Sequence, residues 1–305
     1  MKLTYAFCSY KRSGNLPRLV AAMRAQRCPI PFDILAVNNN SPDDTLAVLE
    51  RLAGEGGAPL RFVTETAQGI VPARNRALEE SLDSDILVFI DDDELPQPGV
   101  LEAACDAILN EGAQCAGGRV QVDFTPHVRP KWLGDELLGF LAEVDHGPKP
   151  FWIQDESTPV WTANVAYDMR IFRAHPELRF DRRFNREGQN IGGGEDVNMF
   201  RALLAQGMKT RYRPDMVVSH FVEPWRLKRL HFLKLHYSNG LRDGQYGDTA
   251  YGRGLLGVPP FLVANIARKT WQATVHFFTR RRGTLRQYMT AIHAVGVLVG
   301  HLRRR

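Results

Sequence analysis

The sequence has few cysteines and lacks an N-terminal apolar core, and each absence excludes a class of protein. It contains four cysteines in 305 residues, Cys8, Cys28, Cys105 and Cys115. Their spacing matches no paired metal-ligand motif, and so low a number is typical of a reducing compartment. We therefore expect four free thiols. Lys11 and Arg12 interrupt the first apolar stretch too early for an export signal, so we expect a cytoplasmic protein.

Acidic residues are absent from the last part of the chain. None follows Asp248, whereas residues 249–305 contain ten Lys or Arg. The net charge of +5 is therefore the sum of a charge of +10 on residues 249–305 and a charge of −5 on residues 1–248. The apolar stretches 254–267, 270–279 and 287–302 are each shorter than the roughly 20 residues of a membrane-spanning helix. Basic residues interleaved with aromatic ones favour an anionic membrane surface over nucleic acid as the partner. Solvated charge and helices that cover the catalytic domain are the alternatives.

Short β-rich runs alternate with helical patterns in the first 125 residues. The runs predicted as strands are 3–9, 32–38, 61–64, 85–91 and 114–124. The segments predicted as helices are 16–26, 44–53, 71–82 and 99–110. Repeated strand-helix units indicate an α/β fold with a doubly wound, mostly parallel sheet. Residues 126–225 look loop-rich, except for a helix that ends near Gly207 and a strand over 209–219.

Three polar loops follow predicted strands, at the sheet edge where doubly wound folds bind ligands. They are Ser9–Arg12, which includes Tyr10, Asn38–Asp44, and Asp91–Glu94. Asn39 and Asp43 in the second loop have groups that can bind a base or ribose, or can form an Asx turn and helix cap. Arg74 lies near a predicted helix start, where it can meet phosphate or base, or serve as surface charge.

The run Asp91-Asp92-Asp93-Glu94 directly follows an apolar strand. Four carboxylates packed together repel one another unless a cation compensates. Mg²⁺ and Mn²⁺ prefer carboxylate oxygen and commonly bridge protein carboxylates to phosphates. The run therefore predicts a divalent-metal site, and a solvated acidic turn is the alternative.

A second acidic centre follows three glycines, Gly192, Gly193 and Gly194. The glycines let the backbone approach a ligand closely, and Glu195 and Asp196 begin a predicted helix, so a carboxylate there suits a general base. The alternative is that both acids only complement the helix dipole. His220, expected at the end of the strand over 209–219, is either a further metal ligand or a structural histidine.

The order and spacing of these motifs resemble the family 2 glycosyltransferases with the GT-A fold. The resemblance runs over residues 3–225 and rests on Cys8–Arg12, Asn38–Asp43, Gly69–Arg76, Asp91–Glu94 and Gly193–Asp196. The Asp-Asp-Asp-Glu and Gly-Gly-Glu-Asp motifs, with a late His-x-x-Glu-Pro, look most like bacterial exopolysaccharide glucosyltransferases of the succinoglycan type.

The resemblance implies an inverting hexosyltransferase with a Mn or Mg cofactor, a nucleotide-diphosphate sugar as donor, UDP-sugar favoured, and a glycan or lipid-linked acceptor. It implies a nucleotide-sugar-binding half (1–125) and an acceptor-binding and catalytic half (126–225). The basic residues beyond the resemblance predict an amphipathic helical extension (226–305) that is peripheral on the inner face of the membrane. The metal ligands are expected to be Asp91, Asp93 and His220, and the base Asp196 with Glu195 in reserve. Nucleotide-sugar contacts are assigned to Ser9, Tyr10, Arg12, Asn39, Asp43, Arg74, Asp91 and Asp92, and acceptor contacts to Trp161, Asn164, Gly193 and Gly194.

Two other functions are compatible with these residues. A sugar nucleotidyltransferase also combines a doubly wound sheet with carboxylate-bound metal, but residues 8–14 match its Gly-rich phosphate loop poorly. A non-catalytic nucleotide-sugar or membrane-binding module would need neither acidic centre, and both centres are intact here.

Overall fold

The structure, a computed structural model, describes residues 1–186, 193–247, 258–279 and 283–303. The chain divides into two compact units. The first, called here the sheet unit, consists of Met1–Thr125 and Leu141–Phe221, and the second, the helical unit, consists of Pro126–Phe140 and Val222–Arg305. Gly192, the first glycine of the predicted run, lies outside the described residues.

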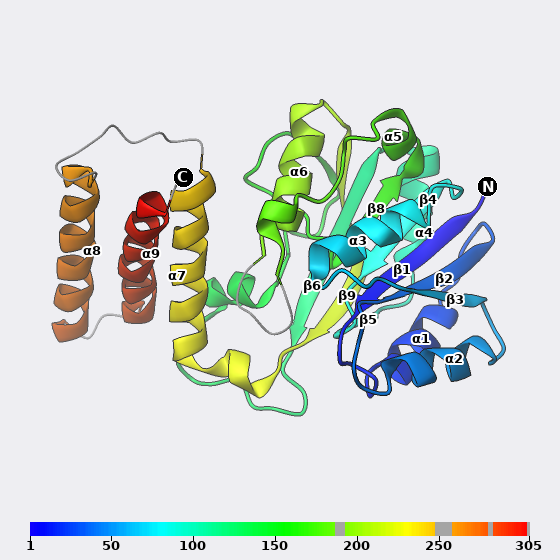
Figure 1. The fold of residues 1–305 in the computed structure, drawn as a ribbon, viewed down its shortest axis with the longest axis horizontal. Helices are drawn as coiled ribbons and strands as arrows, with labels where there is room; N and C mark the ends of the chain where they lie inside the picture. The colour runs from blue at the N-terminus through cyan, green and yellow to red at the C-terminus, as the bar shows by residue number, and fades with distance from the viewer. Residues whose placement is uncertain (187–192, 248–257, 280–282, 304–305) are drawn as a thin grey trace. The chain divides into compact units, whose positions relative to one another are not determined.

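A nine-stranded sheet, counted over the described residues, forms the centre of the sheet unit (Figure 1). Its order is β3-β2-β1-β4-β8-β6-β9-β5, and β7 also pairs with β9. Most of the strands share one direction, whereas β5, β7 and β8 run antiparallel to their neighbours. The strands are β1 (Leu3–Ser9), β2 (Phe32–Asn38), β3 (Leu60–Thr64), β4 (Ile86–Ile90), β5 (Glu94–Pro96), β6 (Cys115–Asp123), β7 (Phe151–Ile153), β8 (Asn164–Asp168) and β9 (Thr210–Phe221).

Helices cover both faces of the sheet, as predicted for a doubly wound fold. One face packs against α1 (Leu16–Arg24), α2 (Thr45–Ala53) and α4 (Val100–Cys105). The other packs against α3 (Ile70–Glu79), α5 (Met169–Ala174) and α6 (Glu195–Ala205). Short 3-10 turns are η2 (Asp135–Leu141), η3 (Arg182–Phe184) and η4 (Pro224–Leu227), and a π-helix, η1 (Asp106–Asn110), continues α4. Successive strand residues point to opposite faces, so Tyr5 and Phe7 enter one core and Ala6 the other.

The carboxyl ends of β1, β2 and β4 lie at one edge of the sheet. β1 pairs in parallel with β2, with Ser9 opposite Asn38, and in parallel with β4, with Ala6 opposite Phe89. The loops that follow these three strands therefore gather at the same edge. This is the arrangement that the sequence predicted for the three polar loops.

The region 126–225 contains more regular structure than the sequence indicated. β8 lies between β4 and β6 with all five of its residues buried. The strand expected over 209–219 extends to Phe221, because β5 pairs with it. His220 is therefore the penultimate residue of β9, opposite Glu94, and lies at the end of the strand as expected.

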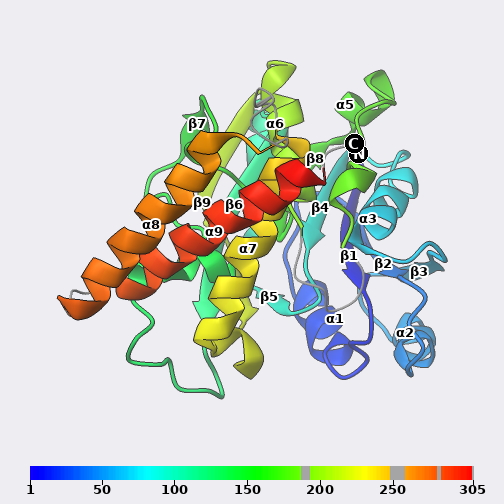
Figure 2. The same ribbon diagram turned by 60° about the vertical axis from the view of Figure 1, so that its left-hand side comes forward.

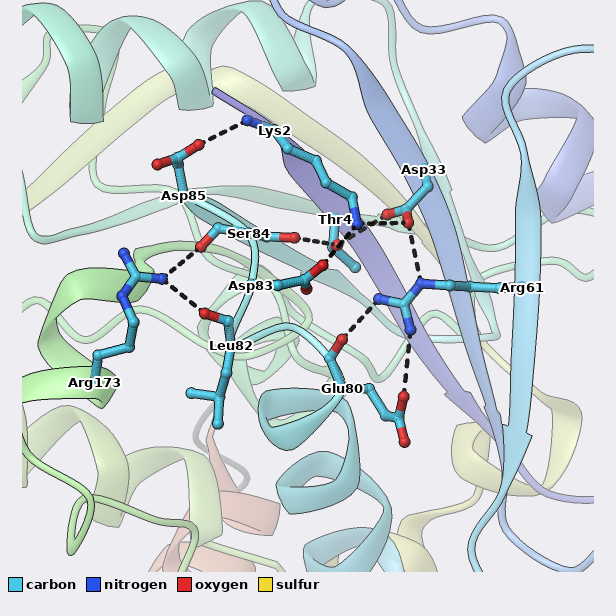
Figure 3. Close-up of polar contacts among 10 residues, drawn as sticks. All are labelled: Lys2, Thr4, Asp33, Arg61, Glu80, Leu82, Asp83, Ser84, Asp85 and Arg173. Carbon is cyan, nitrogen blue, oxygen red and sulfur yellow. Dashed lines mark hydrogen bonds and ion pairs between the residues drawn. The ribbon is translucent and has the colours of Figure 1, made fainter.

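The amino-terminal edge of the sheet, opposite the polar loops, is held by ion pairs (Figure 3). Lys2 Nζ lies 3.3 Å from Oδ2 of Asp33 and 3.3 Å from Oδ2 of Asp83. Arg61 donates to the Asp33 carboxylate at 3.0 Å and to the Glu80 carbonyl at 2.9 Å. Because this network joins the starts of several strands to the end of α3, we interpret it as structural.

The helical unit consists mainly of α7 (Arg229–Tyr246), α8 (Pro260–Phe278) and α9 (Thr284–Leu302), with α9 packed against both of the others (Figure 2). α7 and α9 approach closely at glycines: a Cβ on Gly240 would lie 2.1 Å from the His293 carbonyl oxygen, and one on Gly296 2.4 Å from that of Tyr237. No helix in the described part of the chain is long and apolar enough to span a membrane. The predicted helical extension is present.

Candidate active site

The acidic run lies where β4 ends and β5 begins. Glu94 is fully buried, and its Oε2 accepts a hydrogen bond from the Asp91 backbone N–H at 3.1 Å. Nδ1 of His220 lies 3.5 Å from Asp93 Oδ1 and 3.5 Å from Glu94 Oε1. Burial, with the charges of Asp91 and Asp93, raises the pKa of Glu94 well above its usual value. The run thus joins a buried Glu94, whose charged form burial disfavours, to more exposed aspartates.

Arg12, from the loop after β1, faces the same run. Its Nη2 lies 3.5 Å from Asp93 Oδ2, and its Nε lies 3.9 Å from Asp92 Oδ1. Burial and the charge of Asp93 raise the pKa of Asp92 to about 7, although Arg12 opposes the rise. The loops after β1 and β4, predicted to meet, are in contact here.

Arg74 connects the two acidic centres. Its Nη1 donates to Glu195 Oε1 at 2.6 Å, and its Nη2 donates to Asp91 Oδ1 at 3.1 Å. The side chain is only 6% exposed. Burial disfavours the charged guanidinium, but Asp91 and Glu195 outweigh this and raise its pKa. Surface charge, the alternative for Arg74, is therefore excluded, and contact of Arg74 with a nucleotide stays a prediction.

The second acidic centre begins α6. Gly194 precedes the helix at φ 103°, a left-handed conformation that favours glycine. Glu195 is buried, and its Oε2 has no hydrogen-bond partner among the described residues. Asp196 is partly exposed and accepts a hydrogen bond from the Val197 N–H at 2.8 Å. Burial, together with the charge of Glu195, raises the pKa of Asp196 to about 6. Near neutral pH Asp196 is thus an ionised carboxylate with raised basicity.

The loop after β2 is tied to the segment before α3. Asn39 Nδ2 donates to the carbonyls of Glu65 and Ala67, and its Oδ1 accepts from the Gly69 N–H at 2.7 Å. Asn39 is buried, with its side chain engaged in these bonds. Asn39 therefore shapes the loop, and its contact with the nucleotide stays a prediction.

Asp43 in the same loop is exposed and forms the turn that was its alternative reading. Its Oδ1 accepts from the Thr45 hydroxyl at 2.6 Å and from the Thr45 N–H at 3.2 Å. Burial opposes the shift, but the hydrogen bonds donated by Thr45 and Ser13 together lower the pKa of Asp43. An ionised carboxylate at the turn is compatible with binding a ribose, and that role stays a prediction.

Two asparagines that the sequence did not mark as site residues hold α3, which carries Arg74. Asn185 accepts from the Val71 N–H at 3.1 Å and donates to the Gln68 carbonyl at 3.1 Å. Asn75 exchanges two 2.9 Å hydrogen bonds with the backbone of Phe180. The position of Asn75, directly after Arg74, could have marked it as a site residue. Nothing in the sequence links Asn185 to α3, which lies more than a hundred residues away.

The expected acceptor residues have different environments. Asn164 is buried, and its Nδ2 donates at 3.0 Å to the carbonyls of Arg119 and Met216, across the irregular part of the β6–β9 pairing. Trp161 is partly buried against the core. Asn164 therefore has an evident structural function. Acceptor binding by Trp161, Asn164, Gly193 and Gly194 stays a prediction. Ser9 is buried, and Tyr10 is partly exposed beside Lys11.

The acidic run fits a divalent cation in its chemistry. Asp91 and Asp93 supply carboxylate oxygens, and the side chains are 37% and 15% exposed, so a phosphate-bound metal can reach them. No group of three His, Cys, Asp or Glu side chains within the described residues is arranged around a metal position. Arg12 and Arg74 already compensate part of the charge, so repulsion among the carboxylates does not by itself require a cation.

Comparison with known proteins identifies the family. The family model for glycosyl transferase family 2 matches residues 6–175. Over 112 residues the chain is 30% identical to the uncharacterized glycosyltransferase YfnE of Bacillus subtilis (strain 168), and the match covers 36% of this chain and 28% of YfnE. The chain thus spans little more than a quarter of that relative.

Solved structures share the fold at low identity. The mannosyltransferase PcManGT from Pyrobaculum calidifontis, in complex with GDP-Man and Mn2+, has a TM-score of 0.62 at 15% identity, covering 98% of this chain and 86% of that one. S. aureus TarS 1-349 in complex with UDP-GlcNAc has a TM-score of 0.54 at 13% identity, covering 99% and 91%. These likenesses show the GT-A glycosyltransferase fold. Because the family model matches more than half of the sequence, the chain belongs to glycosyl transferase family 2.

Proposed function

We propose that the chain is a metal-dependent, inverting glycosyltransferase that moves a hexose from a nucleotide-diphosphate sugar to a hydroxyl of a glycan or lipid-linked acceptor. The observation that carries this proposal is the double contact of Arg74 with Asp91 and Glu195. It brings the acidic run after β4 and the acidic start of α6 into one site. The Arg74 side chain therefore links the proposed phosphate-binding region at Asp91 to the start of α6, which carries the candidate base Asp196.

Asp196 is the proposed general base. It accepts the proton of the acceptor hydroxyl while that oxygen forms a bond to the anomeric carbon. The bond between that carbon and the diphosphate oxygen breaks, and the diphosphate departs with the electron pair, so attack from the opposite face inverts the configuration. The raised pKa of about 6 supports this role, because a base is most effective when its pKa approaches the working pH.

Glu195 is less suited to the same step. Its Oε1 is already bound to Arg74 at 2.6 Å, and the side chain is buried, where an acceptor hydroxyl has little access. We propose that Glu195 holds Arg74, while Asp196 carries out the proton transfer. Glu195, which was the reserve candidate for the base, is thus proposed to position Arg74 instead.

Asp91 and Asp93 are the residues proposed to hold a Mn or Mg ion, with His220 next to Asp93. Such an ion would act as a Lewis acid that neutralises the charge developing on the diphosphate. Arg12, beside Asp92 and Asp93, supplies a further cationic group for phosphate binding. Mn2+ in the PcManGT structure supports a divalent ion here.

UDP-sugar is the favoured donor. The similar structures contain GDP-Man and UDP-GlcNAc, so both nucleotide types are compatible with the fold. The resemblance to exopolysaccharide glucosyltransferases supports a role in bacterial surface or exopolysaccharide synthesis. We propose a cytoplasmic enzyme that is peripheral on the membrane, since Trp271 and Phe278 on α8 are 69% and 77% exposed among basic residues.

A donor screen tests the proposed reaction. UDP-, GDP- and dTDP-sugars are incubated with the full chain, with and without Mn²⁺ or Mg²⁺, and free nucleoside diphosphate is measured. We expect metal-dependent release of one nucleoside diphosphate, and NMR of the glycoside should show inversion. Release of pyrophosphate would instead indicate a sugar nucleotidyltransferase. A lack of turnover across donors and acceptors would indicate a non-catalytic module.

A further inference from the structure

Two of the four cysteines lie in contact although 77 residues separate them in sequence. Sγ of Cys28 and Sγ of Cys105 are 3.8 Å apart, in the sheet unit. Cys28 lies between α1 and β2 and is partly exposed, whereas Cys105 is the last residue of α4 and is buried. Both thiols are reduced in this structure. None of the catalytic roles proposed above uses them.

We propose that Cys28 and Cys105 form a peroxide-sensitive dithiol, with Cys28 as the attacking thiol and Cys105 as the resolving thiol. The Cys28 thiolate attacks hydrogen peroxide, the O–O bond breaks, and a sulfenic acid and hydroxide form. Cys105 sulfur then attacks the Cys28 sulfur, water leaves after proton transfer, and a disulfide remains. In total two thiols are oxidised and one peroxide is reduced to two waters.

The surroundings of the pair assign these two roles. Either thiol can donate in this contact; with Cys105 as the donor, the hydrogen bond lowers the pKa of Cys28 to about 7, a change that burial opposes and the Ile30 N–H assists. The same hydrogen bond, together with burial, raises the pKa of Cys105. Cys28 is therefore the more readily ionised thiol of the pair, and the thiolate is the nucleophilic form. Its partial exposure admits peroxide.

The remaining two cysteines lack these properties. Burial raises the pKa of Cys8 to about 12, and burial also raises the pKa of Cys115. Each therefore remains a protonated, unreactive thiol near neutral pH. Closing the Cys28–Cys105 pair requires the sulfur atoms to approach from 3.8 Å to about 2 Å. The irregular helical geometry of η1, which follows Cys105 directly, is a place where the backbone can adjust.

Thiol titration and peptide mapping of the full chain test the proposal. After mild treatment with hydrogen peroxide, the count of reactive thiols in denaturant should fall from four to two, and dithiothreitol should restore it. Digestion should yield one crosslinked peptide pair containing Cys28 and Cys105. A sulfinic or sulfonic Cys28 beside an intact Cys105 thiol, or four surviving thiols, would overturn the proposal.

Matched variants separate this pair from the other cysteines. Cys8→Ser should still lose two thiols, leaving one, whereas Cys28→Ser should keep all three of its thiols. If Cys28→Ser fails to fold, the crosslinked peptide of the unmodified chain still decides the matter, because it identifies the bonded residues directly. A crosslink that includes Cys8 or Cys115 would refute the assignment.

Discussion

Replacing Asp196 with Asn should slow transfer severely and leave the fold intact or stabilise it. Loss of a general base typically lowers the rate by about 10²–10⁴-fold, or about 3–5 kcal/mol in the activation free energy. Asp196 is partly exposed and binds the Val197 N–H through an oxygen that asparagine retains. Donor binding should therefore change little, since Asp196 acts on the acceptor.

The effect on stability follows from the sign of the pKa shift. Burial raises the pKa of Asp196 from 3.8 to about 6, so between these values the folded state binds a proton that the unfolded state has lost. Stability from this group is present below pH 3.8 and is lost as the pH rises through about 6. The full shift corresponds to about 3 kcal/mol, and solvent screening of a partly exposed side chain reduces this to about 1–2 kcal/mol.

Two measurements test this reasoning together. The dependence of kcat/KM on pH in the unmodified enzyme should show an acidic limb near pH 6, because the base must be ionised. Urea unfolding at pH 7.5, a pH at which Asp196 is ionised, should show that Asp196→Asn is at least as stable as the unmodified chain. Retained turnover in Asp196→Asn would refute the base assignment, and a loss of several kcal/mol in stability would refute the electrostatic argument.

Three further changes test the other parts of the site and the extension. Arg74→Gln should destabilise the fold by about 3–5 kcal/mol, because it leaves Glu195 buried without its charge partner; urea unfolding measures this, and an unchanged midpoint would contradict it. Asp93→Asn should weaken Mn²⁺-dependent nucleotide binding by roughly tenfold or more in calorimetry, and unaltered binding would place the metal elsewhere. Trp271→Ala with Phe278→Ala should reduce sedimentation with anionic liposomes; Arg61→Lys in the sheet unit is the control, and undiminished sedimentation would contradict contact through α8.

Much of the fold was predictable because its signals are local. β1 and β2 have the predicted bounds, since each is a run of apolar residues that ends in a polar loop. β8 was not predicted, because Asn164–Asp168 is a short, fully buried run without alternation. The C-terminal helix α8 joins two stretches that Arg268 and Lys269 separate in sequence, since basic residues on a helix surface do not interrupt it.

The candidate site was predictable in its acidic groups but less so in its connections. Asp91 and Asp196 were predicted as site residues from their neighbours in sequence: Asp91 follows an apolar strand, and Asp196 follows a run of glycines. The contacts of Arg74 could not be recognised, because they depend on side chains 17 and 121 residues away. The same holds for Asn185, whose hydrogen bonds to the start of α3 span more than a hundred residues.

The sequence by itself determined the doubly wound arrangement and the edge at which the polar loops gather, because side-chain periodicity and strand direction follow from local chemistry. Only the tertiary structure decided which charges compensate one another. It buried Arg74 between Asp91 and Glu195, placed His220 within β9 beside Asp93, and brought Cys28 against Cys105. These outcomes depend on packing between distant segments, and in a buried site the pKa of each group is set by such neighbours.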